Sequence, residues 1–306
     1  MKKFILSCSI GFILVFALDF TLGHGVTYFY YNQSAGPQYM TTYAMDKSKE
    51  ELLIFGSSRA KHHYNTKVLE DELELSIFNT GSDGNFIFYQ TALLKAILNR
   101  HTPKFIIYDF YGSFGYEQND YDRLSALLPY YNNHPEIREI VNMRSPFELI
   151  KNISHIYPYN STPGKIVMGN ITSKSSKTAH HNNKGYEPVN KKFHNLAEIP
   201  YREPYDFDEN KVKVFREFLQ LCKNRNIPVL VTISPVSYNY PNDFSFEMCK
   251  DICEQEGISV YDFSNKTAFP KDLSLFADEI HLNEQGSTVF SKLIVELVKT
   301  KFNYKK

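Results

Sequence analysis

The chain has 306 residues, and its 34 lysines and arginines balance 34 aspartates and glutamates, so the formal net charge is zero. A balanced chain without a strong basic patch does not have the composition of a nucleic-acid-binding protein. After the N-terminus about 250 residues remain, which suits one large domain or one domain with an insertion.

The N-terminus has the pattern of a membrane anchor. Lys2 and Lys3 precede an uncharged, mostly apolar run from Phe4 to Leu18, which continues past Asp19 to Leu22. This length is near the lower limit of about 17–25 residues for a spanning helix. The lysines predict a cytoplasmic N-terminus, with the rest of the chain outside. The run lacks an Ala-x-Ala cleavage sequence, which favours an uncleaved, single-pass anchor; secretion after signal cleavage is the alternative.

The anchor is followed by a polar segment. Residues 32–49 contain Gly, Pro and Thr and show no long apolar run. Such a composition predicts a tether rather than a packed element. We therefore expect an anchor at 1–31, a tether at 32–49 and a folded domain at 50–306.

The folded part alternates between expected strands and helices. Short apolar runs bounded by turn residues predict strands at 51–55, 75–78, 104–109, 228–233 and 258–262. Helical spacing of apolar residues predicts helices from Gly84 to Leu98 and at 208–226, 244–256 and 284–298. This alternation predicts an α/β fold: a three-layer α/β/α sandwich around a five-stranded parallel sheet.

One long stretch breaks the alternation. Residues 115–202 are rich in Tyr, Asn, His, Lys and Ser, and only a short helix is expected, at 145–153. A loop of this length inside a domain is usually a lid, a binding segment or disordered. Because it follows the third strand at the carboxyl edge of the sheet, we expect an insertion that borders the active site and exchanges amide hydrogens quickly.

A serine follows the first expected strand, where the apolar run ends in Gly56-Ser57-Ser58. In open α/β sheets, ligands bind beyond the carboxyl ends of the strands, which is where Ser58 would lie. Ser and Gly also end many strands because they suit turns, so this motif alone does not assign a function.

A candidate base lies far downstream, in the sequence from Asp278 to His281. A serine hydroxyl needs a neighbouring base to take its proton, and that base needs an orienting group. Asn283 is placed to cap the helix that follows, so the pair would lie on a loop held by a packed helix.

A Gly-rich turn follows the second strand, from Asn79 to Asn85. Such a turn before a helix presents free backbone N–H groups that suit an oxyanion. An ordinary tight turn is the alternative.

Together these pieces resemble the SGNH (GDSL-like) hydrolase superfamily, over residues 51–110 and 208–300. Gly56-Ser57-Ser58 is similar to the Gly-Asp-Ser block of that family, residues 79–84 are similar to its second block, and Asp278 and His281 match its Asp-x-x-His block. The third block, Gly-x-Asn-Asp, reads Gly112-Ser113-Phe114 here, so the asparagine is missing.

The resemblance implies a flavodoxin-like SGNH fold and a serine esterase or acyltransferase that needs no metal or organic cofactor. Ser58, His281 and Asp278 would be catalytic. The backbone N–H groups of Ser58 and Gly84, with the Ser113 hydroxyl, would form the oxyanion hole. Arg59, His62 and Asn85 are candidate substrate-binding residues, although Arg59 and His62 are equally compatible with solvated side chains, and Asn85 is also a substitute for the missing asparagine.

Departures of this kind also occur in membrane-anchored envelope members of the superfamily, which resemble the D-alanine transfer and polysaccharide O-acetylation proteins. They imply a cell-envelope polysaccharide or acylated glycan as substrate, a membrane-bound acyltransferase as a partner, and no nucleic acid. The alternative, suggested by the missing asparagine, is an inactive glycan-binding or envelope assembly protein on the same fold.

The cysteines do not predict a metal site. Cys249 and Cys253 lie four residues apart on an expected helix, without a histidine at ligand spacing. Buried thiols are expected, and one disulfide involving Cys222 is the alternative in an oxidising compartment.

Overall fold

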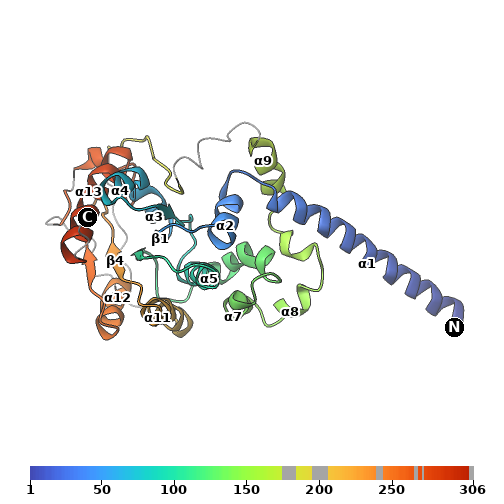
Figure 1. Ribbon diagram of the computed structural model, residues 1–306. Helices are drawn as coiled ribbons and strands as arrows, with labels where there is room; N and C mark the ends of the chain where they lie inside the picture. Colours follow the sequence, from blue (N-terminus) through green and yellow to red (C-terminus); the bar gives the residue numbers. More distant parts are fainter. Residues whose placement is uncertain (174–183, 195–205, 239–243, 265–267, 271, 303–306) are drawn as a thin grey trace.

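The computed structural model describes residues 1–173, 184–194, 206–238, 244–264, 268–270 and 272–302. Its centre is a five-stranded parallel sheet with the strand order β2-β1-β3-β4-β5 (Figure 1). The strands are β1 Leu52–Gly56, β2 Ile77–Asn79, β3 Phe105–Asp109, β4 Val229–Ile233 and β5 Val260–Asp262. This is the flavodoxin-like order of doubly wound folds, and it confirms the predicted α/β class.

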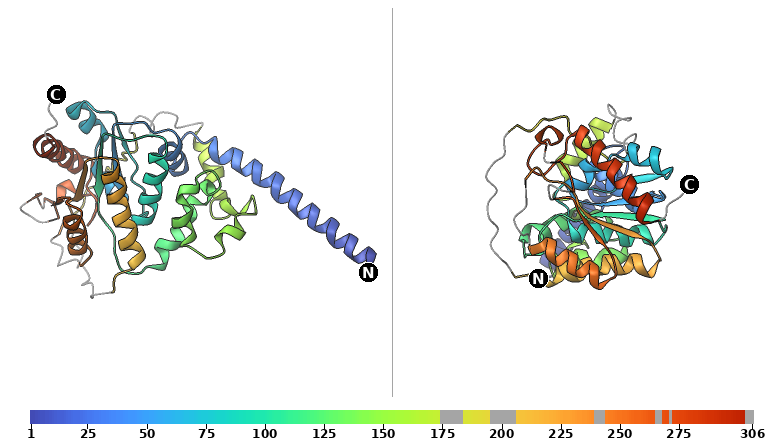
Figure 2. Two further views of the ribbon diagram at one scale, coloured as in Figure 1. Left: turned by 60° about the horizontal axis from the view of Figure 1, so that its bottom comes forward. Right: turned by 90° about the vertical axis from the view of Figure 1, so that its left-hand side faces the viewer.

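Alternate side chains of the strands fill two cores, one on each face of the sheet. Leu53 and Phe55 point into a core closed by α5 Ile87–Leu98, α11 Glu209–Asn224 and α12 Phe244–Gln255. Leu52 and Ile54 point to the other side, which is covered by α3 Ser58–His63, α4 Thr66–Leu73 and α13 Glu284–Lys301. Figure 2 shows these helices on both sides of the sheet. The central strands are buried on both faces, so they consist of continuous apolar runs.

The N-terminal helix α1, Lys2–Tyr31, is continuous over 30 residues and projects away from the domain (Figure 2). It is long and apolar enough to cross a membrane, a test that a signal sequence also passes. Its last turn enters the domain, where Tyr30 is buried in the same core as α5.

Residues 32–49 are not the tether that their composition predicts. They contain α2, Pro37–Asp46, whose Ala44 and Met45 are buried against the core. Arg100 donates to the carbonyls of Ala44 and Met45 and so closes the C-terminal end of this helix. A helix with few apolar residues has little periodicity, which is why its packing could not be read from the sequence.

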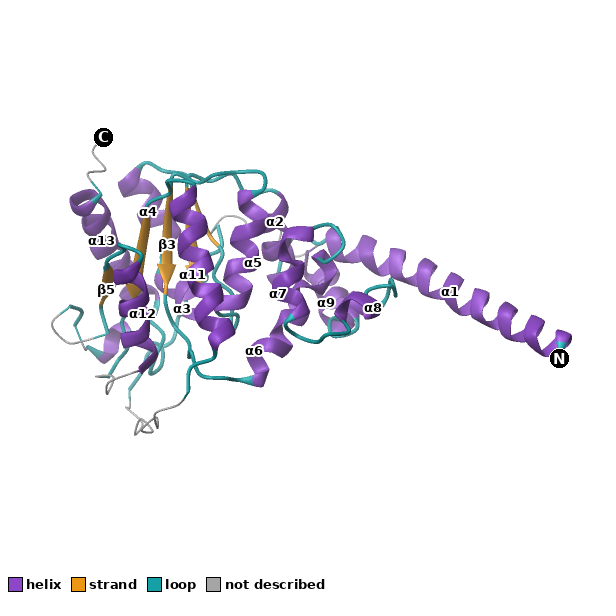
Figure 3. Cartoon of the chain, turned by 90° about the horizontal axis from the view of Figure 1, so that it is seen from below, coloured by secondary structure: helices purple, strands orange, loops and turns teal. Residues whose placement is uncertain are grey.

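The segment after β3 is also more ordered than a long loop. Its helices are α6 Gln118–Asp122, η1 Arg123–Tyr130, η2 Pro135–Ile137, α7 Arg138–Asn142, α8 Glu148–Lys151, η3 Tyr157–Tyr159 and α9 Pro163–Ser173. Leu124, Leu127 and Leu128 are buried with α5, so residues 118–173 form a packed helical subdomain between the sheet and α1 (Figure 3). The expectation of a long loop is therefore wrong for this part, whereas its fast amide exchange stays a prediction. The helices are too short to show a helical period in the sequence. Residues 174–183 and 195–202 of the expected insertion lie outside the described residues.

Hydroxyl groups join this subdomain to the N-terminal helices. The Tyr130 hydroxyl lies 3.2 Å from that of Tyr30 and 2.7 Å from Thr42 Oγ1, and all three residues are buried. Tyr130→Phe is expected to lower the free energy of unfolding by about 1–3 kcal/mol, because the Tyr30 hydroxyl loses its acceptor. Tyr116→Phe, on an exposed ring, is the matched control and should change stability by less than about 0.5 kcal/mol. Equal melting temperatures for the two variants, measured on the full chain in mild detergent, would contradict this packing.

Candidate active site

Ser58 begins α3 directly after β1, at the carboxyl edge of the sheet. Strand β1 lies between β2 and β3, so the chain order reverses here, and ligands of doubly wound sheets bind at such a switch point. Gly56 makes the turn possible. It has a φ of +146°, and a Cβ at this position would lie 2.7 Å from that of Ala60 and 2.8 Å from the Asp109 carbonyl oxygen.

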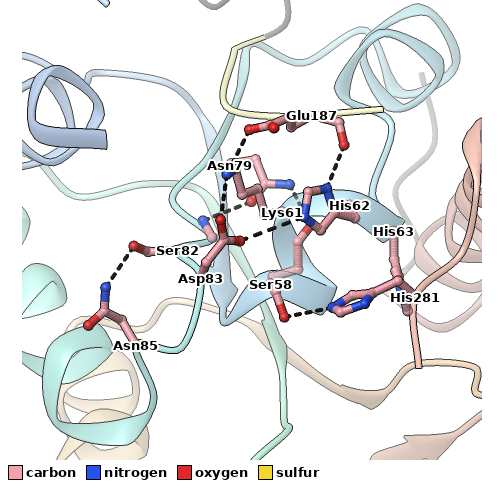
Figure 4. Close-up of polar contacts among 12 residues, drawn as sticks. Ser58, Lys61, His62, His63, Asn79, Ser82, Asp83, Asn85, Glu187 and His281 are labelled. Carbon is pink, nitrogen blue, oxygen red and sulfur yellow. Dashed lines mark hydrogen bonds and ion pairs between the residues drawn. The ribbon is translucent and has the colours of Figure 1, made fainter. Parts of the chain in front are cut away.

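Ser58, His281 and Asp278 form one hydrogen-bonded chain. Ser58 Oγ lies 2.8 Å from His281 Nε2 (Figure 4). The other ring nitrogen, Nδ1, lies 2.9 Å from Asp278 Oδ2. Asp278 Oδ1 also accepts the backbone N–H groups of Ile280 and His281, at 3.0 and 2.9 Å. An ionised carboxylate only accepts, so Nδ1 carries the ring proton and Nε2 can accept that of Ser58.

The environment of Asp278 keeps it ionised. Burial raises its pKa, but the hydrogen bonds from the His281 ring and from the two backbone N–H groups outweigh burial and bring the pKa below its ordinary value. A permanently charged carboxylate at this position fixes the tautomer and orientation of His281.

A second histidine, His63, holds the loop that carries His281. Its Nε2 accepts the N–H of Leu282 at 3.0 Å, and its Nδ1 lies 3.0 Å from Ser234 Oγ. Burial, and then the positive charge of Arg59, lower the pKa of His63 well below its ordinary value. The ring is therefore neutral, with its proton on Nδ1, and it positions the residue next to His281.

The pKa of His63 predicts an acid-sensitive contribution to stability. A histidine with a lowered folded-state pKa stabilises the protein above its unfolded pKa of about 6.5, and this contribution is lost as the pH falls below that value. We therefore expect the free energy of unfolding, measured with urea, to differ less between wild type and His63→Gln at pH 5 than at pH 7.

His134→Gln is the control with the opposite sign. The hydrogen bond to Asp46 raises the pKa of His134. Burial lowers this pKa, and the hydrogen bond to Glu136 raises it further. Its contribution is present below about pH 6.5 and is lost as the pH rises through the folded-state pKa, so the difference from wild type should widen on acidification. The same pH trend in both variants would contradict these assignments.

Arg59 is not at the surface, where a substrate-binding residue would be expected. Its side chain is fully buried, its Nε donates to Ser234 Oγ at 2.9 Å, and its guanidinium stacks 4.6 Å from the centre of the Tyr111 ring. Ser234 Oγ also lies 3.0 Å from Asp109 Oδ2, so the serine links a buried cation to a buried carboxylate. A buried charge requires such compensation, which explains why Arg59 points inward.

His62 and its neighbour Lys61 bind acidic groups around the site. Lys61 Nζ lies 2.9 Å from Asp83 Oδ2 and 2.6 Å from Glu187 Oε2. His62 Nδ1 lies 2.7 Å from the Glu187 carbonyl oxygen, and its Nε2 lies 3.6 Å from Asp83 (Figure 4). His62 thus lies beside the site, but both of its ring nitrogens face protein groups, the Glu187 carbonyl oxygen and the Asp83 carboxylate. Glu187 was missed, because it lies in the long insertion and belongs to no motif.

The other predicted site residues lie together at a small cavity. Gly84, Asn85 and Ser113 line a small cavity of about 10 Å³. Ser113 Oγ accepts the N–H of Gly115 at 2.9 Å, and Asn85 Nδ2 donates to Ser82 Oγ at 2.8 Å. Within the described residues, no hydrogen bond joins any of these three to Ser58. Their roles as oxyanion donors or substrate ligands stay predictions.

Comparisons with known proteins add a distant structural likeness. No family model and no curated protein sequence matches the chain. A similar solved structure is a crystal structure described as a "putative acylhydrolase" from Bacteroides fragilis. It has a TM-score of 0.44 and 10% sequence identity, and the match covers 88% of this chain and 97% of that one. A likeness this distant carries no function to this chain, so its activity is argued from the geometry above.

A cleft of about 580 Å³ is lined by residues around the candidate site, although Ser58, His281 and Asp278 are not among the lining residues. Lys61 and Asp83, which neighbour Ser58, line it together with Arg123 from η1, Lys165 from α9 and Glu187. The packed subdomain therefore forms one side of the cleft. Hydroxyl and amide side chains make up much of the remaining lining: Gln38, Thr41, Thr80, Ser82, Asn85, Ser125, Ser161 and Thr162.

The cysteines and acidic residues give no sign of a metal centre in the part of the chain that is described. No group of three or more His, Cys, Asp or Glu side chains there could hold a metal ion. Cys222, Cys249 and Cys253 are buried free thiols, as one of the two alternatives predicts.

Proposed function

We propose that this protein is a serine ester hydrolase or acyltransferase. The observation that supports it is the hydrogen-bonded chain from Ser58 through His281 to Asp278 at the switch point of the sheet. Ser58 Oγ attacks the ester carbonyl while its proton passes to His281 Nε2. The imidazolium, held by Asp278, then gives this proton to the leaving alcohol and leaves an acyl-serine.

The tetrahedral intermediate needs donors for its oxyanion, and we assign these to backbone N–H groups. Ser58 is in the first turn of α3, where an N–H has no acceptor within the helix. Gly84 and the Ser113 hydroxyl are the further candidates. A donor of this kind contributes about 3–4 kcal/mol to transition-state stabilisation, so the absence of the third-block asparagine weakens the site without removing it.

The proposed substrate is an O-acylated polysaccharide of the cell envelope. The cleft lined by Lys61, Asp83 and Glu187 is large enough for sugar residues, and its hydroxyl and amide lining can hydrogen-bond their hydroxyl groups. Hydrolysis and transfer share the acyl-serine and differ in whether water or a glycan hydroxyl takes the acyl group. A membrane-bound acyltransferase would be the acyl donor in the second case.

We further propose that α1 stays attached as a single-pass anchor and that the domain lies outside the cytoplasm. Lys2 and Lys3 at the start of α1 support this orientation. Protease added to intact cells should digest the domain. A domain that is digested only after lysis would contradict the orientation, and mature protein lacking α1 would indicate a cleaved signal.

The alternative is an inactive glycan-binding or envelope assembly protein, which the missing asparagine of the third block favours. Turnover of p-nitrophenyl acetate by the purified full chain separates the two functions. The proposal predicts release of p-nitrophenolate above the rate with Ser58→Ala. Equal rates for the two proteins, combined with binding of polysaccharide, would favour the alternative.

A further inference from the structure

The segment around α8 has its polar residues inside and its apolar residues outside. Glu148 and Asn152 are 0% and 7% exposed, whereas Leu149, Ile150 and Ile153 are 66%, 64% and 67% exposed. Glu148 is satisfied internally, by Arg144 at 2.7 Å and by the Tyr157 hydroxyl at 2.8 Å. A helix that faces water shows the opposite arrangement, so this surface is adapted to an apolar environment.

Outside α1, large apolar side chains exposed by 60% or more are found, among the described residues, only at Tyr116, within 147–153 and on α9, where Val167 and Ile171 are 60% and 62% exposed. Four of them lie within the seven residues from Phe147 to Ile153. Exposed apolar side chains gathered in this way mark an interaction surface rather than ordinary exposure.

Both helices lie at the end of the domain from which α1 projects (Figures 1 and 2). Asp19 of α1 accepts the Ser154 hydroxyl at 2.5 Å and the His155 N–H at 2.7 Å, just after Ile153. On the other side, Asn170 of α9 donates to the Phe29 carbonyl at 2.9 Å. Gly23 leaves no room for a side chain, because His155 lies directly against it. The domain is therefore fixed to α1 rather than suspended from it.

This attachment sets the level of the surface relative to a bilayer. The hydrocarbon core spans about 20 helical residues, so a core that begins near Phe4 ends near Gly23. Asp19 lies within that length, and the residues bonded to it lie at the same height along α1. Ile153 and its neighbours are thereby held at the outer boundary of the hydrocarbon core.

We propose that Phe147, Leu149, Ile150 and Ile153, the docking face, rest in the outer leaflet of the lipid bilayer. The inference relies on the proposed retention of α1 as an anchor. Helix α9 is bonded to α1 at Phe29, beyond the end of the hydrocarbon core, and is not part of this face.

The test uses the full chain, one copy per nanodisc of phosphatidylcholine, with an environment-sensitive NBD probe on a single cysteine. Leu149→Cys and Ile150→Cys, each in a Cys8→Ser background, report on the docking face. Lys213→Cys, on an exposed residue of α11, is the control. Lipids that carry a doxyl quencher near the headgroup should remove about half or more of the fluorescence at positions 149 and 150 and leave position 213 nearly unchanged.

A probe on the native Cys8 of α1, exposed along the helix, separates this inference from the anchor itself. Quenching at Cys8 without quenching at positions 149 and 150 would overturn the docking face and leave the anchor intact. No quenching at any position would overturn both. A blue shift at position 150 that appears only in discs with two copies would show that a second copy, rather than lipid, covers the face, and would also overturn the proposal.

Discussion

Replacing Ser58 with alanine is expected to lower the turnover of p-nitrophenyl acetate by about 10⁴–10⁶-fold, because the acyl-serine can no longer form. The melting temperature should hardly change, since Ser58 is only half-buried and its described hydrogen bond is to His281. Ser57→Ala is the matched control. Its Oγ is buried and, among the described residues, has no hydrogen-bond partner, so this variant should keep its turnover.

His281→Ala should lower turnover as much as Ser58→Ala, and the double variant should be no worse than either single variant. When two groups act as one unit, removing either abolishes the contribution of both to turnover, so the two fold-losses do not multiply. Turnover that persists in Ser58→Ala, or that falls equally in Ser57→Ala, would contradict the role of Ser58.

The second large effect is on stability. Asp109→Asn is expected to lower the free energy of unfolding by about 3–5 kcal/mol, because Arg59 would be left as an uncompensated buried charge. Burial raises the pKa of Asp109, while Arg59 and the hydrogen bonds from Ser234 and Tyr64 favour the charged form. The carboxylate accepts from Ser234 N at 3.0 Å and from the Tyr64 hydroxyl at 3.1 Å, so its neighbours are all oriented toward an acceptor.

Asp262→Asn is the matched control for this substitution. Asp262 also ends a strand, but it is partly exposed and lies 3.2 Å from Lys250 at the edge of the sheet. An ion pair of that kind contributes up to about 1 kcal/mol. Equal shifts of the urea midpoint for the two variants would show that Asp109 and Arg59 do not form the compensated pair described here.

The central sheet could be predicted from sequence because its strands are continuous apolar runs that end at turn residues. Leu52 to Phe55 gave the position of β1 within one residue. The meeting of Ser58 with His281 was predictable for a related reason. Residues that follow parallel strands collect at one edge of the sheet, even when they are far apart in the chain.

The surroundings of the site could not be predicted in the same way. Arg59 follows the candidate nucleophile and so suggested a substrate ligand, but its direction is decided by the buried carboxylate of Asp109 on another strand. Glu187 reaches Lys61 from an insertion without periodicity. Helix α2 has too few apolar residues to reveal its packing. In each case the contacting residue is distant in the sequence, so no local sequence pattern predicts the contact.

The role of Ser58 is tested most directly by reacting the full chain with a fluorophosphonate at neutral pH and mapping the adduct by peptide mass spectrometry. The account predicts one phosphonylated residue, Ser58, with no adduct in Ser58→Ala and much slower labelling in His281→Ala. An unlabelled wild-type protein, or an adduct on Ser57 or another serine instead of Ser58, would contradict it.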